Sequence, residues 1–273
     1  TMFRKGMLIF LGALMVMGAG QALAAPKTVL MVMTSADKLP VKAQDGRTVV
    51  HPTGYWGEEF RAPYEIFRQA GFTVEVASPR GPNPPLDPVS DDDAMKAFLA
   101  ANPGLMKSVK TLRQAVAHWH GDALFIVGGH GAMVDLPGDP NLEILVNRHF
   151  IHTGGNGGII SAVCHGPAGF LRQQVQILSG VRVTGFSDEE EAVAEANFLG
   201  GKVPYSLEKS LGKIGARYER GPAWQPFVVV DQIRFAMSGA PLPGNRVITV
   251  ITGQNPASST EVARMIVKAL NGG

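Results

Sequence analysis

One cysteine and its histidine neighbour stand where nucleophilic catalysis is expected. Cys164 is the only cysteine of the 273-residue chain, and His165 follows it directly. The apolar run at residues 158–163 is typical of a buried strand, and Pro167 suits the start of a helix. The pattern therefore predicts a strand that runs into the cysteine and a helix that follows it.

Small residues flank the cysteine at the spacing that a nucleophile elbow requires. Ala162 and Gly166 lie two residues before and two after Cys164, where a sharp strand-to-helix turn tolerates no bulk. Such a turn presents the sulfur at the carboxyl end of a strand, beside a helix N-terminus that favours the thiolate. The alternative is a buried small hydrophobe, as most free cysteines are. A chance cysteine seldom occupies an elbow, so the pattern favours a reactive thiol.

A glycine-rich turn and an acidic helix start supply further candidates. Gly128, Gly129 and Gly131 surround His130 after an apolar run, and glycines there let a ligand approach backbone N–H groups. His130 is expected either to line a pocket or to stabilise the turn.

The acidic helix start begins with Ser187-Asp188-Glu189-Glu190, which has the form of a capping box. Glu190 then has a structural task, and Glu191 is left free to turn inward. Glu190 stays an alternative for the inward-facing acid.

Two histidine groups have partial metal-ligand spacing. His118 and His120 lie near Asp122, and His149 lies one helical turn from His152. Neither group shows a third ligand at the expected spacing, so both are interpreted as surface or loop histidines. We expect no metal and no cofactor.

The N-terminus has the features of a secretory signal peptide. Arg4 and Lys5 precede an apolar run at residues 7–17, and Ala22-Leu23-Ala24 forms a small-x-small cleavage pattern. The run is shorter than the roughly 20 residues that span a bilayer. We expect residues 1–25 to be removed, with cleavage after Ala24 or Ala25, and the protein to be exported to the periplasm or secreted.

Composition bounds the remaining chain. It is 45% hydrophobic and 18% charged, which excludes a disordered protein, and a single cysteine excludes internal disulfides. Cleavage removes two of the 25 basic residues and leaves 23, which equals the 23 acidic residues. A neutral chain argues against nucleic-acid binding and against membrane docking after cleavage. Residues 26–273 are expected to form a single domain.

The order of apolar runs predicts the fold class. Strands are expected at residues 27–33, 72–78, 123–127, 158–163, 182–185, 227–230 and 247–251. Helices are expected at residues 63–70, 92–100, 142–152, 166–173, 188–198, 207–216 and 259–270. The alternation predicts an α/β fold with a mostly parallel sheet and helices on both faces. Loops are expected at residues 35–54, 79–90 and 232–245, and the run Asp91–Asp93 is expected to favour the dipole of the helix that it starts.

Several motifs in the same order resemble the ThiJ/PfpI superfamily, in its branch of heat-shock chaperones and glutathione-independent glyoxalases. The resemblance covers nearly all of residues 27–270. It rests on the segments at residues 53–60, 77–81, 85–88, 128–131, 162–167, 183–186 and 252–259.

The resemblance implies a flavodoxin-like sandwich and a set of site residues. It matches the nucleophile to Cys164, the triad histidine to His165 and the triad acid to Glu191. The oxyanion donors match the amides of Gly129 and His165. The buried acid near the sulfur matches Glu59. From the residues alone, a Glu just upstream of a helix that contains Pro63 is expected to face solvent, and Glu58 is an equal candidate for the exposed one of the pair.

The resemblance also implies the activity. It implies a cysteine enzyme that converts methylglyoxal or related small dicarbonyls to 2-hydroxy acids such as lactate, without a cofactor, in a homodimer. A periplasmic holdase chaperone and a cysteine peptidase or other hydrolase are the alternatives. The amidotransferase relatives carry a downstream catalytic histidine, and no histidine follows His165, so that activity is excluded.

Overall fold

The computed structural model describes residues 25–153, 157–174, 176–235 and 246–273. The predicted signal peptide therefore lies outside the described residues except for Ala25, as does most of the loop expected at residues 232–245. Within the described part of the chain, no helix combines the length and the hydropathy that crossing a bilayer requires.

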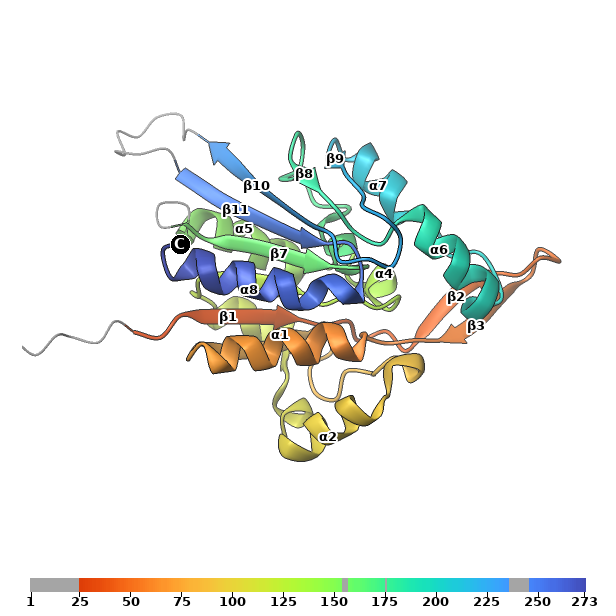
Figure 1. Cartoon of the computed structure of the whole chain (residues 1–273), viewed down its shortest axis with the longest axis horizontal. Coiled ribbons are helices and arrows are strands. Elements are labelled where there is room, and N and C mark those ends of the chain that lie inside the picture. Colours follow the sequence, from red (N-terminus) through yellow and green to blue (C-terminus); the bar gives the residue numbers. More distant parts are fainter. Residues whose placement is uncertain (1–24, 154–156, 175, 236–245) are drawn as a thin grey trace, which may run out of the picture.

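A seven-stranded sheet forms the centre of the molecule (Figure 1). Its order is β10-β11-β7-β6-β1-β4-β5, and every pair is parallel except β10 with β11. The strands are β1 Thr28–Val32, β4 Thr73–Ser78, β5 Lys110–Thr111, β6 Ala123–Ile126, β7 Ile159–Val163, β10 Val228–Phe235 and β11 Arg246–Gly253. The inner strands β6 and β7 are buried along their whole length, as continuous apolar runs predict.

Helices cover both faces of this sheet, as expected for a flavodoxin-like sandwich. Helices α1 (Gly57–Gln69) and α8 (Ser259–Leu270) lie side by side on one face, and α3 (Leu112–His118) packs with α5 (Pro140–Thr153) on the other (Figure 1). In α8 the buried residues Val262, Ala263 and Ile266 form one stripe, which a 3.6-residue period directs at the sheet. Helix α2 (Asp93–Ala101) begins at Asp92, whose side chain accepts a hydrogen bond from the Met95 amide, as the acidic run predicted.

Two expected loops contain regular structure. Strands β2 (Lys38–Lys42) and β3 (Thr48–Pro52) form an antiparallel hairpin within the segment expected to be a loop at residues 35–54. The first strand was not predicted because it contains Pro40, and a proline within a run argues against a central strand. Strand β10 also runs through residues 232–235, which were expected to be loop.

The run at residues 182–185 forms a strand outside the central sheet. Strand β8 (Arg182–Val183) pairs instead with β9 (Arg217–Tyr218) in a separate two-stranded sheet. Its expected place in the main sheet is therefore wrong.

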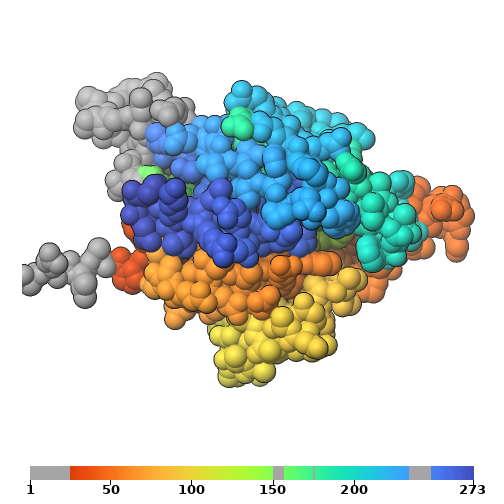
Figure 2. Space-filling model, in the orientation of Figure 1, coloured from red at the N-terminus to blue at the C-terminus, as the bar shows by residue number. Residues whose placement is uncertain are grey.

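Short helices gather near the carboxyl ends of the parallel strands. They are α4 (Ala132–Asp135), the 3-10 helix Gly166–Phe170, α6 (Asp188–Ala194), the π-helix Glu195–Leu199 and α7 (Leu207–Lys213). The hairpin joins them through paired backbone hydrogen bonds between Lys42 and Lys202, and Figure 2 shows it projecting from the body beside α6. These segments surround the place where the elbow cysteine emerges from β7.

Candidate active site

Cys164 occupies the predicted elbow between β7 and the following 3-10 helix. Its φ of 55° lies in the left-handed region, which is rare for residues other than glycine. The turn is fixed by hydrogen bonds from the Cys164 amide to the Gly253 carbonyl (2.9 Å) and from the Phe186 amide to the Cys164 carbonyl (2.9 Å). A Cβ on Gly166 would lie 2.4 Å from the Ile126 carbonyl oxygen, so the small residue predicted there is required by close packing.

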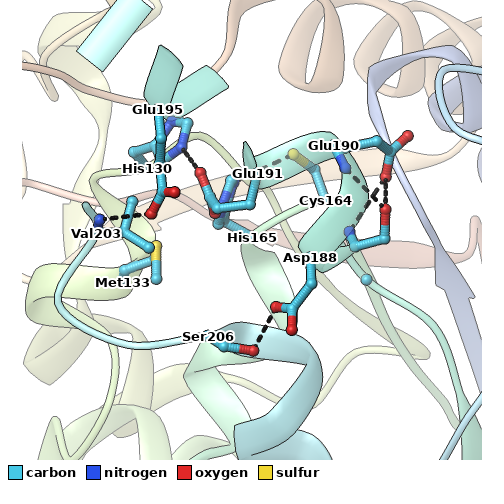
Figure 3. A network of polar contacts seen from close by, with 12 residues as sticks. His130, Met133, Cys164, His165, Asp188, Glu190, Glu191, Glu195, Val203 and Ser206 are labelled. Atoms are coloured by element: carbon cyan, nitrogen blue, oxygen red, sulfur yellow. Dashed lines mark hydrogen bonds and ion pairs between the residues drawn. The ribbon is translucent and has the colours of Figure 1, made fainter. Parts of the chain in front are cut away.

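The structure brings three of the predicted residues into one line (Figure 3). Nδ1 of His165 lies 3.3 Å from Sγ of Cys164, and Nε2 of His165 lies 2.8 Å from Oε2 of Glu191. All three side chains are buried. A carboxylate can accept hydrogen bonds but cannot donate them. Nε2 of His165 therefore carries the proton, and Nδ1 faces the thiol as an acceptor.

Glu191 also holds the second histidine of the site. Nε2 of His130 lies 2.8 Å from Oε1 of Glu191, and the two imidazole rings are 4.1 Å apart between centroids. His130 thus lines the pocket and bonds to the acid, a contact across 61 residues that no local spacing predicted. Burial alone raises the pKa of Glu191, but the imidazoles of His165 and His130 outweigh it and lower that pKa well below its ordinary value.

Glu190 faces away from the imidazoles and performs the capping task predicted for it. The Ser187 hydroxyl accepts a hydrogen bond from the Glu190 amide, and the Glu190 carboxylate accepts one from the Ser187 amide. The same buried carboxylate accepts from the side chains of Gln254 and Asn255 and from the Trp224 amide. It therefore connects the start of α6 to two distant loops.

Glu59 lies in the first turn of α1, where it is completely buried and contacts Cys164. The solvent-facing position expected from the residues alone is wrong, because α1 begins at Gly57 and not near Pro63. Within the described structure neither carboxyl oxygen has a well-aligned hydrogen-bond partner, so its contacts with Cys164 and the Gly128 amide compensate burial only weakly. Burial therefore raises the pKa of Glu59 well above its ordinary value and favours the protonated acid at neutral pH.

The thiol is also protonated in the resting site. Burial raises the pKa of Cys164 well above its ordinary value. The expected help from a helix N-terminus is too small to reverse this, because the helix after Cys164 is a 3-10 turn of five residues. Burial lowers the pKa of His165, so a neutral imidazole faces a neutral thiol.

One backbone amide is directed at the sulfur, and another beside it has no hydrogen-bond partner among the described residues. The amide of Gly129 points to Cys164 and opposes the rise of its pKa, whereas the amide of His165 donates no hydrogen bond to another described residue. Gly129 has a φ of +93°, and a Cβ there would lie 2.4 Å from the Gly54 carbonyl oxygen. Only glycine allows this close approach, which agrees with the predicted oxyanion-binding role of the turn.

A cavity of about 240 Å³ opens above the cysteine. Its lining combines the predicted site residues with apolar and aromatic side chains that the sequence analysis missed: Trp56, Val89, Phe186, Phe198, Leu199 and Trp224. Among the described residues that line it, none is Lys or Arg. A tryptophan isolated in the Gly-Pro-rich segment at residues 221–226 was the one local signal that pointed to this wall.

The predicted histidine groups outside the site have different surroundings. His118 and His120 are exposed, as expected. His149 is buried and stacks on Trp119, with ring centroids 6.3 Å apart, and burial lowers its pKa to about 4. The interpretation of His149 as a surface histidine is therefore wrong, and the side chain of His152 lies outside the described residues.

One described group has the composition of a metal site. Ligand atoms of His130, His165 and Glu191 lie within 4.8 Å of one another, and two imidazoles with one carboxylate suit zinc or iron. The same atoms already satisfy one another through the two 2.8 Å hydrogen bonds, so their arrangement is complete without an ion.

The chain is similar in sequence and in structure to several known proteins. A glutathione-independent glyoxalase of Schizosaccharomyces pombe is 29% identical over 233 residues, which cover 80% of this chain and 89% of the relative. A glutathione-independent glyoxalase of Saccharomyces cerevisiae is 28% identical over 263 residues, which cover 90% and 99%. The X-ray structure of the 24 kDa Rapid Encystment Protein of Francisella tularensis is 31% identical, with a TM-score of 0.68 and coverage of 89% and 99%.

The family assignment follows from a match across the centre of the chain. The sequence profile of the DJ-1/PfpI family matches residues 48–205, a segment that contains Glu59, the elbow at Cys164 and the acid Glu191. This match spans more than half of the chain and confirms the resemblance drawn from the motifs. The protein belongs to the DJ-1/PfpI family.

Proposed function

We propose that the protein is a glutathione-independent glyoxalase that converts methylglyoxal or a related small dicarbonyl to the 2-hydroxy acid. The observation that carries the proposal is the buried Cys164 thiol between two groups of opposite character. The thiol contacts both a neutral imidazole oriented by Glu191 and a protonated carboxyl at Glu59. Two relatives that align over most of the chain bear the name of this activity.

The first step is the addition of sulfur to the aldehyde. The Cys164 sulfur bonds to the aldehyde carbon while the thiol proton passes to Nδ1 of His165. The amides of Gly129 and His165 donate to the developing oxyanion, and protonation of that oxygen gives a hemithioacetal. Because the imidazole is neutral at rest, it is ready to accept the proton.

The second step is the internal redox step, and it requires a proton relay. One oxygen of the Glu59 carboxyl takes the proton from the former aldehyde carbon, while the other gives its own proton to the ketone oxygen. The product is an enediol. Return of the proton to the second carbon, with loss of the hydroxyl proton from the first, leaves a thioester. The aldehyde carbon is oxidised and the ketone carbon reduced, so no cofactor is consumed.

The last step is hydrolysis of the thioester. Water attacks the thioester carbon, the C–S bond breaks, and His165 returns a proton to the sulfur. The products are lactate and the free thiol. His130, which lines the cavity and shares Glu191 with His165, is placed to contact the substrate during these steps.

The decisive experiment supplies methylglyoxal to the purified, reduced protein without glutathione or metal. We expect lactate from the intact protein and none from a Cys164→Ala variant that has the same circular dichroism spectrum. Absence of lactate from the folded, reduced protein contradicts the proposal. Suppression of client aggregation that survives in Cys164→Ala would then favour the chaperone, and cleavage of peptides would favour the hydrolase.

We propose that this activity is located outside the cytoplasm, because Arg4, Lys5 and the apolar run after them have the form of a signal peptide. Expression of the whole chain in a Gram-negative host, followed by N-terminal sequencing of the periplasmic fraction, tests it. The expected N-terminus is Ala25 or Pro26. An uncleaved protein confined to the cytoplasm contradicts the location and leaves the chemistry intact. The homodimer stays a prediction, which the molar mass in solution tests.

A further inference from the structure

We propose that the cavity selects 2-oxoaldehydes that carry a neutral aryl group, and that Trp224 and Phe198 set this selectivity. The inference rests on the proposed glyoxalase activity and names its preferred substrate class. It predicts that an aryl dicarbonyl such as phenylglyoxal, converted to mandelate, is used more efficiently than methylglyoxal.

The size of the cavity is the first argument. Its volume of about 240 Å³ equals the space of about eight waters, at about 30 Å³ each. A three-carbon dicarbonyl bonded to Cys164 leaves most of this space unfilled. Filling an apolar cavity with an apolar group is more favourable in free energy than filling it with water. A phenyl ring attached to the ketone fills the part of the cavity next to the rim.

Aromatic side chains form a continuous wall from the reacting centre to that rim. The Phe186 ring lies 4.6 Å from the His165 ring and 5.7 Å from the Trp224 ring, which it meets edge to face at 75°. A flat aryl group fits such a wall by edge-to-face or offset contacts. The wall begins at the His165 imidazole, which contacts Cys164. A substrate with its carbonyls at Cys164 can therefore place its aryl ring along this wall.

Trp224 is held in this wall at the expense of backbone strain. Its φ of 63° is rare for a bulky residue, and its amide donates a 2.8 Å hydrogen bond to Oε1 of Glu190. That carboxylate is buried and anchored by Gln254 and Asn255. Strain that the surrounding structure maintains is typical of ligand-binding positions.

Phe198 forms the other exposed aromatic part of the rim. It lies in the π-helix Glu195–Leu199, a kind of segment that often occurs at functional sites. Phe198 is 54% exposed and Trp224 is 44% exposed. Large aromatic rings exposed at the mouth of a cavity gain stabilisation when an apolar ligand covers them.

The charge of the lining restricts the substituent. No Lys or Arg stands among the described lining residues, whereas Asp87 does. An anionic substituent on the aryl group would enter an apolar cavity without a counter-charge, which is costly. The cavity therefore selects neutral aryl dicarbonyls, and the carboxylate formed by the reaction also lacks a cation to retain it.

The test compares kcat/KM for phenylglyoxal and methylglyoxal, with mandelate and lactate as readouts. We expect phenylglyoxal to be preferred by about tenfold and 4-carboxyphenylglyoxal to be used poorly. Trp224→Ala and Phe198→Ala should each lower the ratio of kcat/KM for phenylglyoxal to kcat/KM for methylglyoxal by about tenfold. Ile144→Ala, which removes a side chain of similar exposure on α5, is the matched control and should change neither.

A binding measurement separates this inference from the proposed activity. Acetophenone has an aryl ketone but no aldehyde, and its saturation-transfer NMR signal should be strong with the wild-type protein and weak with Trp224→Ala. If methylglyoxal is turned over but phenylglyoxal is not preferred, or if Trp224→Ala affects both substrates equally, the aryl selectivity is wrong. If neither dicarbonyl is turned over but acetophenone binds through Trp224, the glyoxalase activity is wrong and the aryl site stands. Absence of both turnover and binding overturns both.

Discussion

Two buried carboxyl groups flank the Cys164–His165 pair, and their surroundings are opposite. Glu191 accepts a hydrogen bond from each of two imidazoles, and these partners lower its pKa. Glu59 lies against the sulfur without a well-aligned partner, and burial raises its pKa. One acid is kept charged to orient an imidazole, and the other is kept neutral to give and take a proton. The same residue type thus serves two tasks because the surroundings differ.

The two acids also differ in whether the fold provides their carboxyl groups with hydrogen-bond partners. The charged acid is stabilised by the two imidazoles that it orients, whereas the neutral acid is fully buried without a well-aligned partner. A group without good partners in the interior destabilises the fold, so its presence beside the sulfur is more easily explained by chemistry than by stability. Replacing one carboxyl at a time with an amide tests the role of each acid separately.

The largest expected effect is the loss of turnover in Glu191→Gln. An amide has one acceptor oxygen and one donor nitrogen, so it cannot accept hydrogen bonds from both imidazoles. When His165 changes tautomer, its Nδ1 carries a proton and cannot receive that of the thiol. We expect kcat for the dicarbonyl to fall by about 10³-fold. Glu189→Gln, a neighbour whose side chain is exposed, is the control, and equal activity of the two variants would contradict the orienting role.

Turnover should fall somewhat less in Glu59→Gln, by about 10²-fold. The amide keeps the volume of the carboxyl but cannot exchange its proton with the substrate carbons. The measurement is kcat for lactate formation, together with release of a deuterium label from the aldehyde position. Glu58→Gln changes the adjacent, exposed carboxyl and should leave kcat unchanged. Full activity of Glu59→Gln would exclude the proton relay.

The same Glu59→Gln variant should be more stable than the wild type at pH 7. A carboxyl with a raised pKa keeps its proton in the folded state after the unfolded chain has released it. Folding stability is therefore lost as the pH rises above the ordinary value of 4.5. Removing the group should raise the unfolding free energy by about 2 kcal/mol at pH 7 and change it little at pH 4. Urea unfolding at both pH values measures this, and an equal change at both would contradict the raised pKa.

Glu191→Gln should have the opposite and smallest effect on stability. A carboxyl with a lowered pKa contributes stability that is complete above its ordinary value of 4.5 and is lost as the pH falls further. We expect the variant to lose about 1 kcal/mol at pH 7. The difference from the wild type should shrink as both proteins are acidified below pH 4. Unfolding curves that stay parallel down to pH 3 would show that the two imidazoles do not lower this pKa.

Much of the fold was predictable because its signals are local. Helix α8 has the bounds expected from its apolar stripe, Ser259–Leu270, and the buried strands follow continuous apolar runs. The start of α1 was missed because Pro63 resembles a first-turn proline. It instead lies inside the helix, where it removes the hydrogen bond to the Glu59 carbonyl. The hairpin was missed because Pro40 lies in the middle of β2, although exposed and buried residues alternate along the whole strand.

The site residues were predictable only where they lie close together in the sequence. The elbow at Cys164 and the capping box at Glu190 are each encoded within a few residues. The contact of His130 with Glu191 and the hydrogen bond from Trp224 to Glu190 connect segments 61 and 34 residues apart. Such contacts depend on how the segments pack, so no single-sequence pattern carries them.

The way in which Trp224 is attached has a consequence for how this enzyme can change. Its loop is fastened through a backbone amide, which every residue except proline possesses, and not through the indole. Natural or laboratory evolution can therefore exchange the ring without detaching the loop. Asparagine or glycine would also accept the left-handed backbone more readily. The position is free to vary while Cys164 and its partners stay fixed, so new specificities can arise on an unchanged catalytic centre.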